Sequence, residues 1–223
     1  MSIIWILENK EKSWSVYELS KGAAAMVQAN DAQVQSNGAL NESLSYRPTL
    51  DFVKELEKSR FILKDSKTSE YSVARVPDLV KLVSLARPVT GLKAIGYKSP
   101  LDFEGTLRLV HGSKLEYSFT MFAGSELYRS YVMTDQVHAY IRVGEEKKWE
   151  EYLLLKKCLK AEKAHANLFL LPTKNEVLIK QAKKLKGFSI APTTILLSDL
   201  WSFGGLGEEQ ARFLMDAWLE NRM

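Results

Sequence analysis

The spacing of apolar residues changes near residue 88, and this change constrains the fold of the 223-residue chain more than any other feature. Before residue 88, apolar side chains recur at helical intervals and are followed by two short apolar runs, residues 61–63 and 71–73, around a charged turn. After residue 88, segments in which apolar and polar residues alternate, as in strands, are interspersed with segments whose apolar residues recur at helical spacing. This arrangement indicates a layered α/β domain. We therefore expect two domains, residues 1–88 and 89–223.

Three helices are expected in the first domain. The apolar face of the first helix consists of Ile3, Ile4 and Leu7, and that of the second consists of Val16, Leu19, Ala23 and Met26. Ser13 or Ser15 is available to cap the second helix. The third helix has Pro48 in its first turn and an apolar stripe of Leu50, Val53 and Leu56. Three helices followed by a hairpin is the order of a winged helix-turn-helix.

Two sequence segments resemble the winged-helix regions of many prokaryotic regulators: VYELSK and SYRPTLDFVKELEKSRFILKD. In such proteins the third helix enters the major groove and the hairpin forms the wing. The resemblance therefore implies DNA contacts from Ser45, Tyr46, Arg47, Thr49, Lys54, Lys58, Lys64 and Lys67. Arg47 and Thr49 are expected at base edges, and the lysines at phosphates.

The segment between the second and third helices departs from that pattern. A helix-turn-helix has three or four residues there, whereas residues 28–43 intervene in this chain. This stretch is rich in Asn, Gln, Ser, Gly and Ala and has almost no large apolar residues, so we expect a long loop. A winged helix that acts only in protein–protein interaction is the alternative for this domain.

The second domain is expected to alternate strands and helices. Strands are predicted at residues 115–121, 137–143, 166–172 and 188–191. Helices are predicted at residues 124–131, 149–159, 178–185 and 211–218, and a further helix at residues 77–87 directly precedes the domain boundary. The segment between residues 89 and 103 carries two glycines and a proline, and it is expected to form the boundary region.

The C-terminal segment FSIAPTTILLSDLWSFGGLGEEQARFLMDAW resembles the end of the type IV abortive-infection antitoxin family (AbiEi-like). MFAGSELYRSYV, VHAYI and HANLFLLP stand where that family has a helix entry and two strands. The resemblance implies a DNA-binding repressor, the antitoxin of a type IV toxin–antitoxin system, whose second domain has a nucleotidyltransferase-like topology. Its expected partners are double-stranded DNA, a second copy of the chain and a toxin protein.

One pattern suggests catalysis. Gly124 and Ser125 precede Asp135 at the spacing at which nucleotidyltransferases place a Gly-Ser pair before two metal-binding carboxylates. The second carboxylate position holds Val137, so one acid stands where two are needed. A nucleotidyl-transferring enzyme is therefore the alternative function, and we expect no catalytic residues, metal ligands or cofactor.

Composition bears on the compartment and on the strength of any DNA contact. A single cysteine, Cys158, excludes an internal disulfide framework, and no segment has the pattern of a signal peptide or a membrane span, so a cytoplasmic location is expected. The net charge of +4 is mild. DNA contacts must therefore come from a local cluster of cations.

Overall fold

The computed structural model describes residues 2–28 and 46–220. The chain divides into two compact units, Met1–Val83 and Ser84–Met223, and the division falls within helix α4 (Val76–Ala86). The domain boundary expected between residues 88 and 89 lies just after this helix. No helix within the described ranges is both long enough and apolar enough to cross a membrane.

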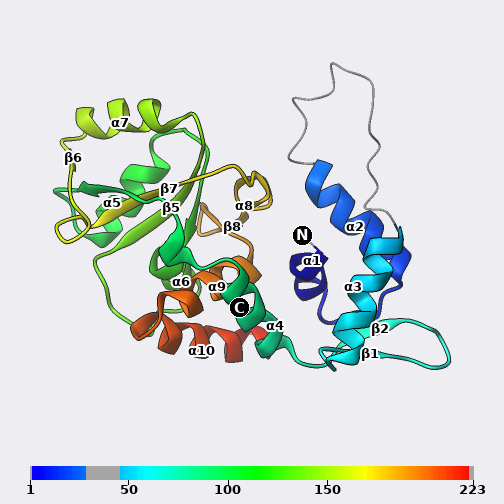
Figure 1. Cartoon of the computed structure of the whole chain (residues 1–223). Coiled ribbons are helices and arrows are strands. Elements are labelled where there is room, and N and C mark those ends of the chain that lie inside the picture. The colour runs from blue at the N-terminus through cyan, green and yellow to red at the C-terminus, as the bar shows by residue number, and fades with distance from the viewer. Residues whose placement is uncertain (1, 29–45, 221–223) are drawn as a thin grey trace, which may run out of the picture. The chain divides into compact units, whose positions relative to one another are not determined.

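The first unit contains three helices and an antiparallel hairpin. In chain order its elements are α1 (Ser2–Glu8), α2 (Val16–Gln28), α3 (Tyr46–Lys58), β1 (Ile62–Lys64) and β2 (Tyr71–Val73). Helix α2 contacts both α1 and α3, and α3 leads into the hairpin (Figure 1). The three expected helices and the two hairpin strands are confirmed. The loop expected over residues 28–43 lies outside the described residues, except that Gln28 ends α2.

Helix α2 begins where its sequence predicts. The backbone N–H of Glu18 donates to Ser15 Oγ at 3.2 Å, and the backbone N–H of Ser15 donates to Glu18 Oε2 at 2.8 Å. This reciprocal capping box satisfies two backbone donors that have no partner inside the helix. Leu19 and Ala23 are fully buried, which confirms the apolar face. Of the two candidate caps, Ser15 is therefore the one used.

One residue between α1 and α2 extends the hairpin. Trp14 pairs with Tyr71 of β2 through two backbone hydrogen bonds of 2.8 and 2.9 Å. Their rings stack with centroids 5.5 Å apart, and both side chains are buried. This pairing ties the start of α2 to the hairpin, a long-range contact that the sequence pattern did not predict.

The second unit is built on a seven-stranded mixed sheet of strand order β6-β3-β7-β5-β4-β9-β8. Its strands are β3 (Ile95–Lys98), β4 (Tyr117–Thr120), β5 (Val137–Arg142), β6 (Leu159–Lys160), β7 (Leu168–Thr173), β8 (Lys183–Leu185) and β9 (Phe188–Ile190). The pairs β5–β7 and β4–β9 are parallel, and the other neighbouring pairs are antiparallel. A mixed α and β class is therefore confirmed.

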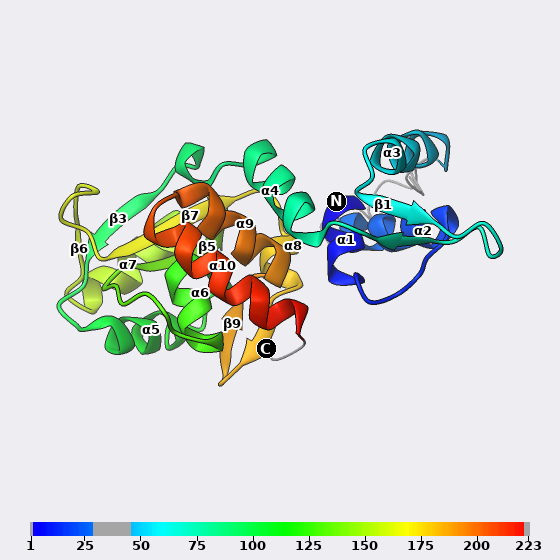
Figure 2. The same cartoon turned by 90° about the horizontal axis from the view of Figure 1, so that it is seen from below.

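Helices cover both faces of this sheet. They are α5 (Phe103–His111), α6 (Met121–Tyr128), α7 (Glu146–Leu155), α8 (Val177–Lys180), α9 (Thr193–Phe203) and α10 (Leu206–Leu219), with a 3-10 turn, η1 (Val89–Gly91). Helices α6, α9 and α10 pack against one another on one face, and α5 and α7 lie on the other (Figure 1, Figure 2). The central strands are buried because helices cover both sides.

The helix predicted over residues 178–185 is wrong. Helix α8 ends at Lys180, and residues 183–185 form β8, which pairs antiparallel with β9. Lys186 and Gly187 join the two strands, and both have positive φ angles, 51° and 86°. A two-residue turn with two positive φ angles matches the twist of a hairpin. Pairing with β9 therefore prevails over the helical spacing of the apolar residues.

Two other predicted elements have different ends. Met121, expected at the end of a strand, is the first residue of α6 and has a φ of 51°. The helix expected to continue to residue 159 ends at Leu155, and Leu159 belongs to the edge strand β6. Strand β3 lies inside the segment between residues 89 and 103, and helix α5 begins at its last residue; neither element was expected from the sequence.

Candidate functional site

Helix α3 presents a basic face to solvent. Val53 and Leu56 are buried in the first unit, whereas the side chains of Arg47, Lys54 and Lys58 are exposed. Arg47 and Lys54 are about two turns apart, and Lys58 follows one turn later, so the three cations lie along one side of the helix. Within the described part of the chain, no ion pair joins any of them to an acid.

The first turn of α3 separates the expected contact residues into exposed and buried ones. Tyr46 and Arg47 are exposed, whereas Thr49 is only 4% exposed. Thr49 lies one turn before Val53, on the buried side of the helix, so its side chain faces the interior of the unit. The expected contact between Thr49 and a base edge is therefore not supported by this structure. Ser45 lies outside the described residues.

The hairpin holds the last two expected contact residues. Lys64 ends β1, and Lys67 lies in the turn; both are exposed. The turn is held by the Asp65 carboxylate, whose Oδ1 accepts hydrogen bonds from the backbone N–H groups of Lys67 at 2.6 Å and Thr68 at 3.2 Å. This Asx-type arrangement fixes the backbone from which the Lys67 side chain extends into solvent.

The candidate catalytic residues are not brought together. Ser125 lies on α6, is 2% exposed, and donates a hydrogen bond from Oγ to the carbonyl of Phe122 at 3.1 Å. Asp135 is exposed in the loop before β5, and Val137 is fully buried in β5. A buried hydroxyl that is bonded within its own helix is not placed to contact a triphosphate. This arrangement therefore gives no support to nucleotidyl transfer at these residues.

A buried polar cluster centres on Asp199, whose role the sequence alone left open between a cap and a contact with a partner. Asp199 is on α9 and is fully buried. Its carboxylate accepts hydrogen bonds of 2.6 Å from Arg87, Thr120 and Tyr140. These partners come from the segment after α4, the end of β4 and the middle of β5. The cluster therefore joins α9 to the sheet. The one sequence feature that pointed to it was a single acidic residue, Asp199, within an otherwise apolar segment.

The charges in this cluster stabilise one another. Burial opposes the charge of the Arg87 guanidinium, but Asp199 and Tyr140 outweigh that effect, so the pKa of Arg87 is raised. Burial and then the charge of Asp199 raise the pKa of the Tyr140 hydroxyl well above its usual value. The Arg87 guanidinium also donates to the Tyr140 hydroxyl. The Arg87 guanidinium therefore stays charged and the Tyr140 hydroxyl keeps its proton across the neutral range, which is typical of a structural contact.

The three histidines, at positions 111, 138 and 165, are separate in the structure. His111 is hydrogen-bonded to the Tyr117 hydroxyl at 3.0 Å, and His138 is buried in β5. Within residues 2–28 and 46–220, no group of three or more His, Cys, Asp or Glu side chains is arranged to hold a metal ion. Cys158 is a buried free thiol, and burial raises its pKa.

No protein-family model matches the chain, and neither does any curated protein or solved structure. Its function is therefore inferred from the placement and chemistry of its own residues.

Proposed function

We propose that the first unit is a winged helix that binds double-stranded DNA and that the protein is a transcriptional repressor. The observation that carries this proposal is the exposed stripe of Arg47, Lys54 and Lys58 along α3, none of which makes an ion pair within the described ranges. Unpaired cations on one side of an exposed helix are suited to a polyanion. The overall charge of +4 does not oppose such a contact.

The order of elements supports the same proposal. In a winged helix the third helix enters the major groove, and a hairpin that follows it contacts the flanking backbone. Here α3 is followed directly by β1 and β2, and Lys64 and Lys67 extend from that hairpin. The pairing of Trp14 with Tyr71 anchors the hairpin to the start of α2, so the wing has a defined attachment.

A repressor of this size is expected to bind as a homodimer. One winged helix makes few phosphate contacts, and two half-sites increase affinity without a larger domain. A toxin protein is the further partner that the antitoxin resemblance suggests, and it is best sought by co-purification. A cytoplasmic location follows from this function. A protein-interaction role for the same unit is the alternative, and loss of DNA binding in the experiments below would favour it.

The first prediction concerns sequence-specific binding. Arg47→Ala is expected to weaken binding to the cognate site by about 1–3 kcal/mol and to change binding to scrambled duplex little, because a side chain in the first turn of α3 contacts base edges. Fluorescence anisotropy with DNA from upstream of the protein's own coding sequence, and with its scrambled version, measures both affinities. An unchanged ratio of the two affinities would show that α3 is not the recognition helix.

The second prediction concerns the wing. Lys67→Ala is expected to weaken binding to the cognate and the scrambled duplex equally. It is also expected to reduce the slope of log K against log salt by about one unit, because it removes one phosphate contact. Lys147→Ala is the matched control, because Lys147 is an exposed lysine on α7 of the second unit. Asp51→Asn removes an acid from the basic face of α3 and is expected to tighten both complexes. Equal effects of Lys67→Ala and Lys147→Ala would contradict the role of the wing.

A further inference from the structure

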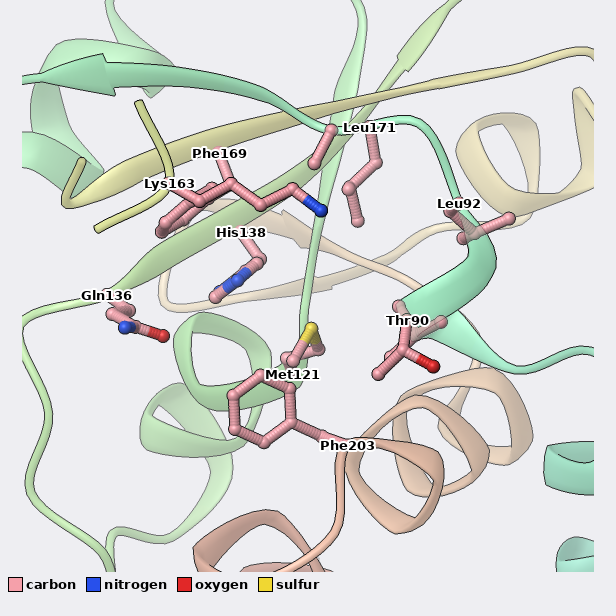
Figure 3. Close-up of a pocket in the computed structure, with 11 residues that line it drawn as sticks. Thr90, Leu92, Met121, Gln136, His138, Lys163, Phe169, Leu171 and Phe203 are labelled. Carbon is pink, nitrogen blue, oxygen red and sulfur yellow. The ribbon is translucent and has the colours of Figure 1, made fainter. Parts of the chain in front are cut away.

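A cavity of about 250 Å³ opens in the second unit, and neither the DNA-binding proposal nor the sequence analysis accounts for it (Figure 3). Its wall combines η1 and the segment after it, the start of α6, the strands β5 and β7, and the end of α9. Most of the lining side chains are apolar: Val89, Leu92, Met121, Phe169, Leu171 and Phe203. A concave, mainly apolar wall with a few polar groups is typical of a small-molecule site.

His138 provides an aromatic surface in this cavity. Its ring stacks on Phe169 with centroids 4.7 Å apart and an interplanar angle of 11°, and Phe203 meets it edge-on at 6.4 Å. The side chain is 6% exposed, and Nδ1 makes no hydrogen bond within the described residues. Burial lowers the pKa of His138 to about 3, so the ring is neutral at physiological pH. The cavity therefore offers flat, uncharged surfaces to a ligand.

Met121 lines the same cavity from a strained position. It joins β4 directly to α6 with a φ of 51°, a conformation that costs an L-residue without a short polar side chain about 1–3 kcal/mol. Met121 is 1% exposed, and Figure 3 shows its sulfur pointing toward the middle of the lining side chains. Strained residues of this kind cluster at ligand sites, because the surrounding structure must hold them in place.

A single cation is available to the apolar cavity. Within the described residues, Lys163 is the one charged side chain that lines the cavity, and Figure 3 shows its amine between the side chains of Leu171 and His138. Lys163 makes no ion pair within the described ranges. A second, more polar hollow shares Lys163 and Gln136 with the cavity, and it adds Lys98 and His165. Among the described residues, Asp135 is the only acid that lines either hollow, so the junction favours an anion.

We propose that this cavity binds a small aromatic molecule that carries an anionic group, with the ring against His138, Met121 and Phe203 and the anion at Lys163. A cavity of about 250 Å³ is at the small end of ligand sites, so it suits a single ring. The polar hollow beyond Lys163 accommodates the anionic arm. The proposal does not depend on DNA binding, because every lining residue belongs to the second unit.

Phenylacetate is the probe that tests this assignment. The full chain is labelled with methyl-¹³C methionine, and the Met121 signal is assigned by its loss in Met121→Leu. A ring that enters the cavity is expected to shift the Met121 methyl resonance in a saturable way at millimolar phenylacetate, the range expected for so small a ligand. Met26 and Met133 lie outside the cavity lining and are expected to keep their positions.

Matched ligands and variants separate the two halves of the site. Phenylacetamide keeps the ring but lacks the charge, and it is expected to bind about five-fold more weakly, the effect of one solvated ion pair. Lys163→Gln is expected to weaken the binding of phenylacetate by the same factor and to leave the binding of phenylacetamide unchanged. Lys147→Gln is expected to affect the binding of neither ligand. Acetate alone is expected to leave Met121 unshifted.

Three results would overturn the proposal. They are the absence of a saturable Met121 shift up to about 50 mM phenylacetate, equal affinity for phenylacetate and phenylacetamide, and equal effects of Lys163→Gln and Lys147→Gln. None of them bears on the DNA-binding proposal, which is measured on the first unit with different variants.

Discussion

Asp199→Ala is expected to lower the free energy of unfolding of the second unit by about 3–5 kcal/mol, the range for breaking a buried ion pair by removing one partner. The Asp199 side chain is fully buried, and the Arg87 side chain is 24% exposed. Removing the carboxylate leaves Nη1 of Arg87 and the hydroxyls of Thr120 and Tyr140 without the acceptor that they share, although Nη2 of Arg87 keeps the Tyr140 hydroxyl. Each unsatisfied buried donor carries a desolvation cost.

Native-state hydrogen exchange at the backbone amides of β5 and β7 measures this loss in the full chain, because these central strands exchange only when the second unit unfolds. Glu208→Ala is the matched control. It breaks an exposed ion pair with Arg212 on α10 and is expected to cost no more than about 1 kcal/mol.

A double variant tests whether the cost comes from unpaired charge. Arg87→Met combined with Asp199→Leu removes both charges, and it is expected to recover most of the stability lost in Asp199→Ala. Asp199→Ala and Glu208→Ala with equal effects would contradict a structural role for the cluster.

His138→Phe is expected to remove a pH dependence of stability of about 2 kcal/mol between pH 7 and pH 5. Burial lowers the pKa of His138 in the folded state to about 3, against 6.5 for a free side chain. Below pH 6.5 the unfolded chain binds a proton that the folded chain does not, so stability falls as the pH falls, by about 1.4 kcal/mol per unit. Above pH 6.5 this contribution is fully present.

The measurement is the difference in free energy of unfolding between pH 7 and pH 5, from the same exchanging amides in the wild type and in His138→Phe. Phenylalanine keeps an aromatic ring on Phe169 and has no proton to bind. His165→Gln is the control, because His165 is exposed in the same unit and the variant is expected to keep the wild-type difference. An undiminished pH dependence in His138→Phe would contradict a buried, neutral imidazole.

Local sequence determined the first unit to a large extent. The stripes of α2 and α3 and the two apolar runs of the hairpin are short-range patterns, so they predicted three helices and a hairpin in the observed order. The exposed positions of Arg47, Lys54 and Lys58 follow from the same helical period. The burial of Thr49 could also have been predicted from the sequence, because Thr49, Val53 and Leu56 share one face of the helix. Its place in the first turn of the helix was taken as a sign of base recognition, although its spacing indicated the core.

Tertiary contacts decided the parts that the sequence analysis missed. Strand β8 exists because β9 pairs with it across a turn with two positive φ angles, and β3 exists because β7 pairs with it from about seventy residues away. Short apolar runs such as these adopt a helix or a strand according to their neighbours. A single-sequence pattern contains no information about which neighbour is present.

The two candidate sites differ in the same way, because one depends on local sequence and the other on contacts between distant elements. The basic face of α3 lies within thirteen consecutive residues, so helical periodicity alone predicted it. The cavity brings together Thr90, Met121, His138, Lys163 and Phe203, which lie on separate elements across more than half of the second unit. Its shape, the neutral state of His138 and the position of Lys163 depend on how those elements pack. Packing at a distance in sequence is decided by the fold, because desolvation and side-chain contact act between neighbours in space.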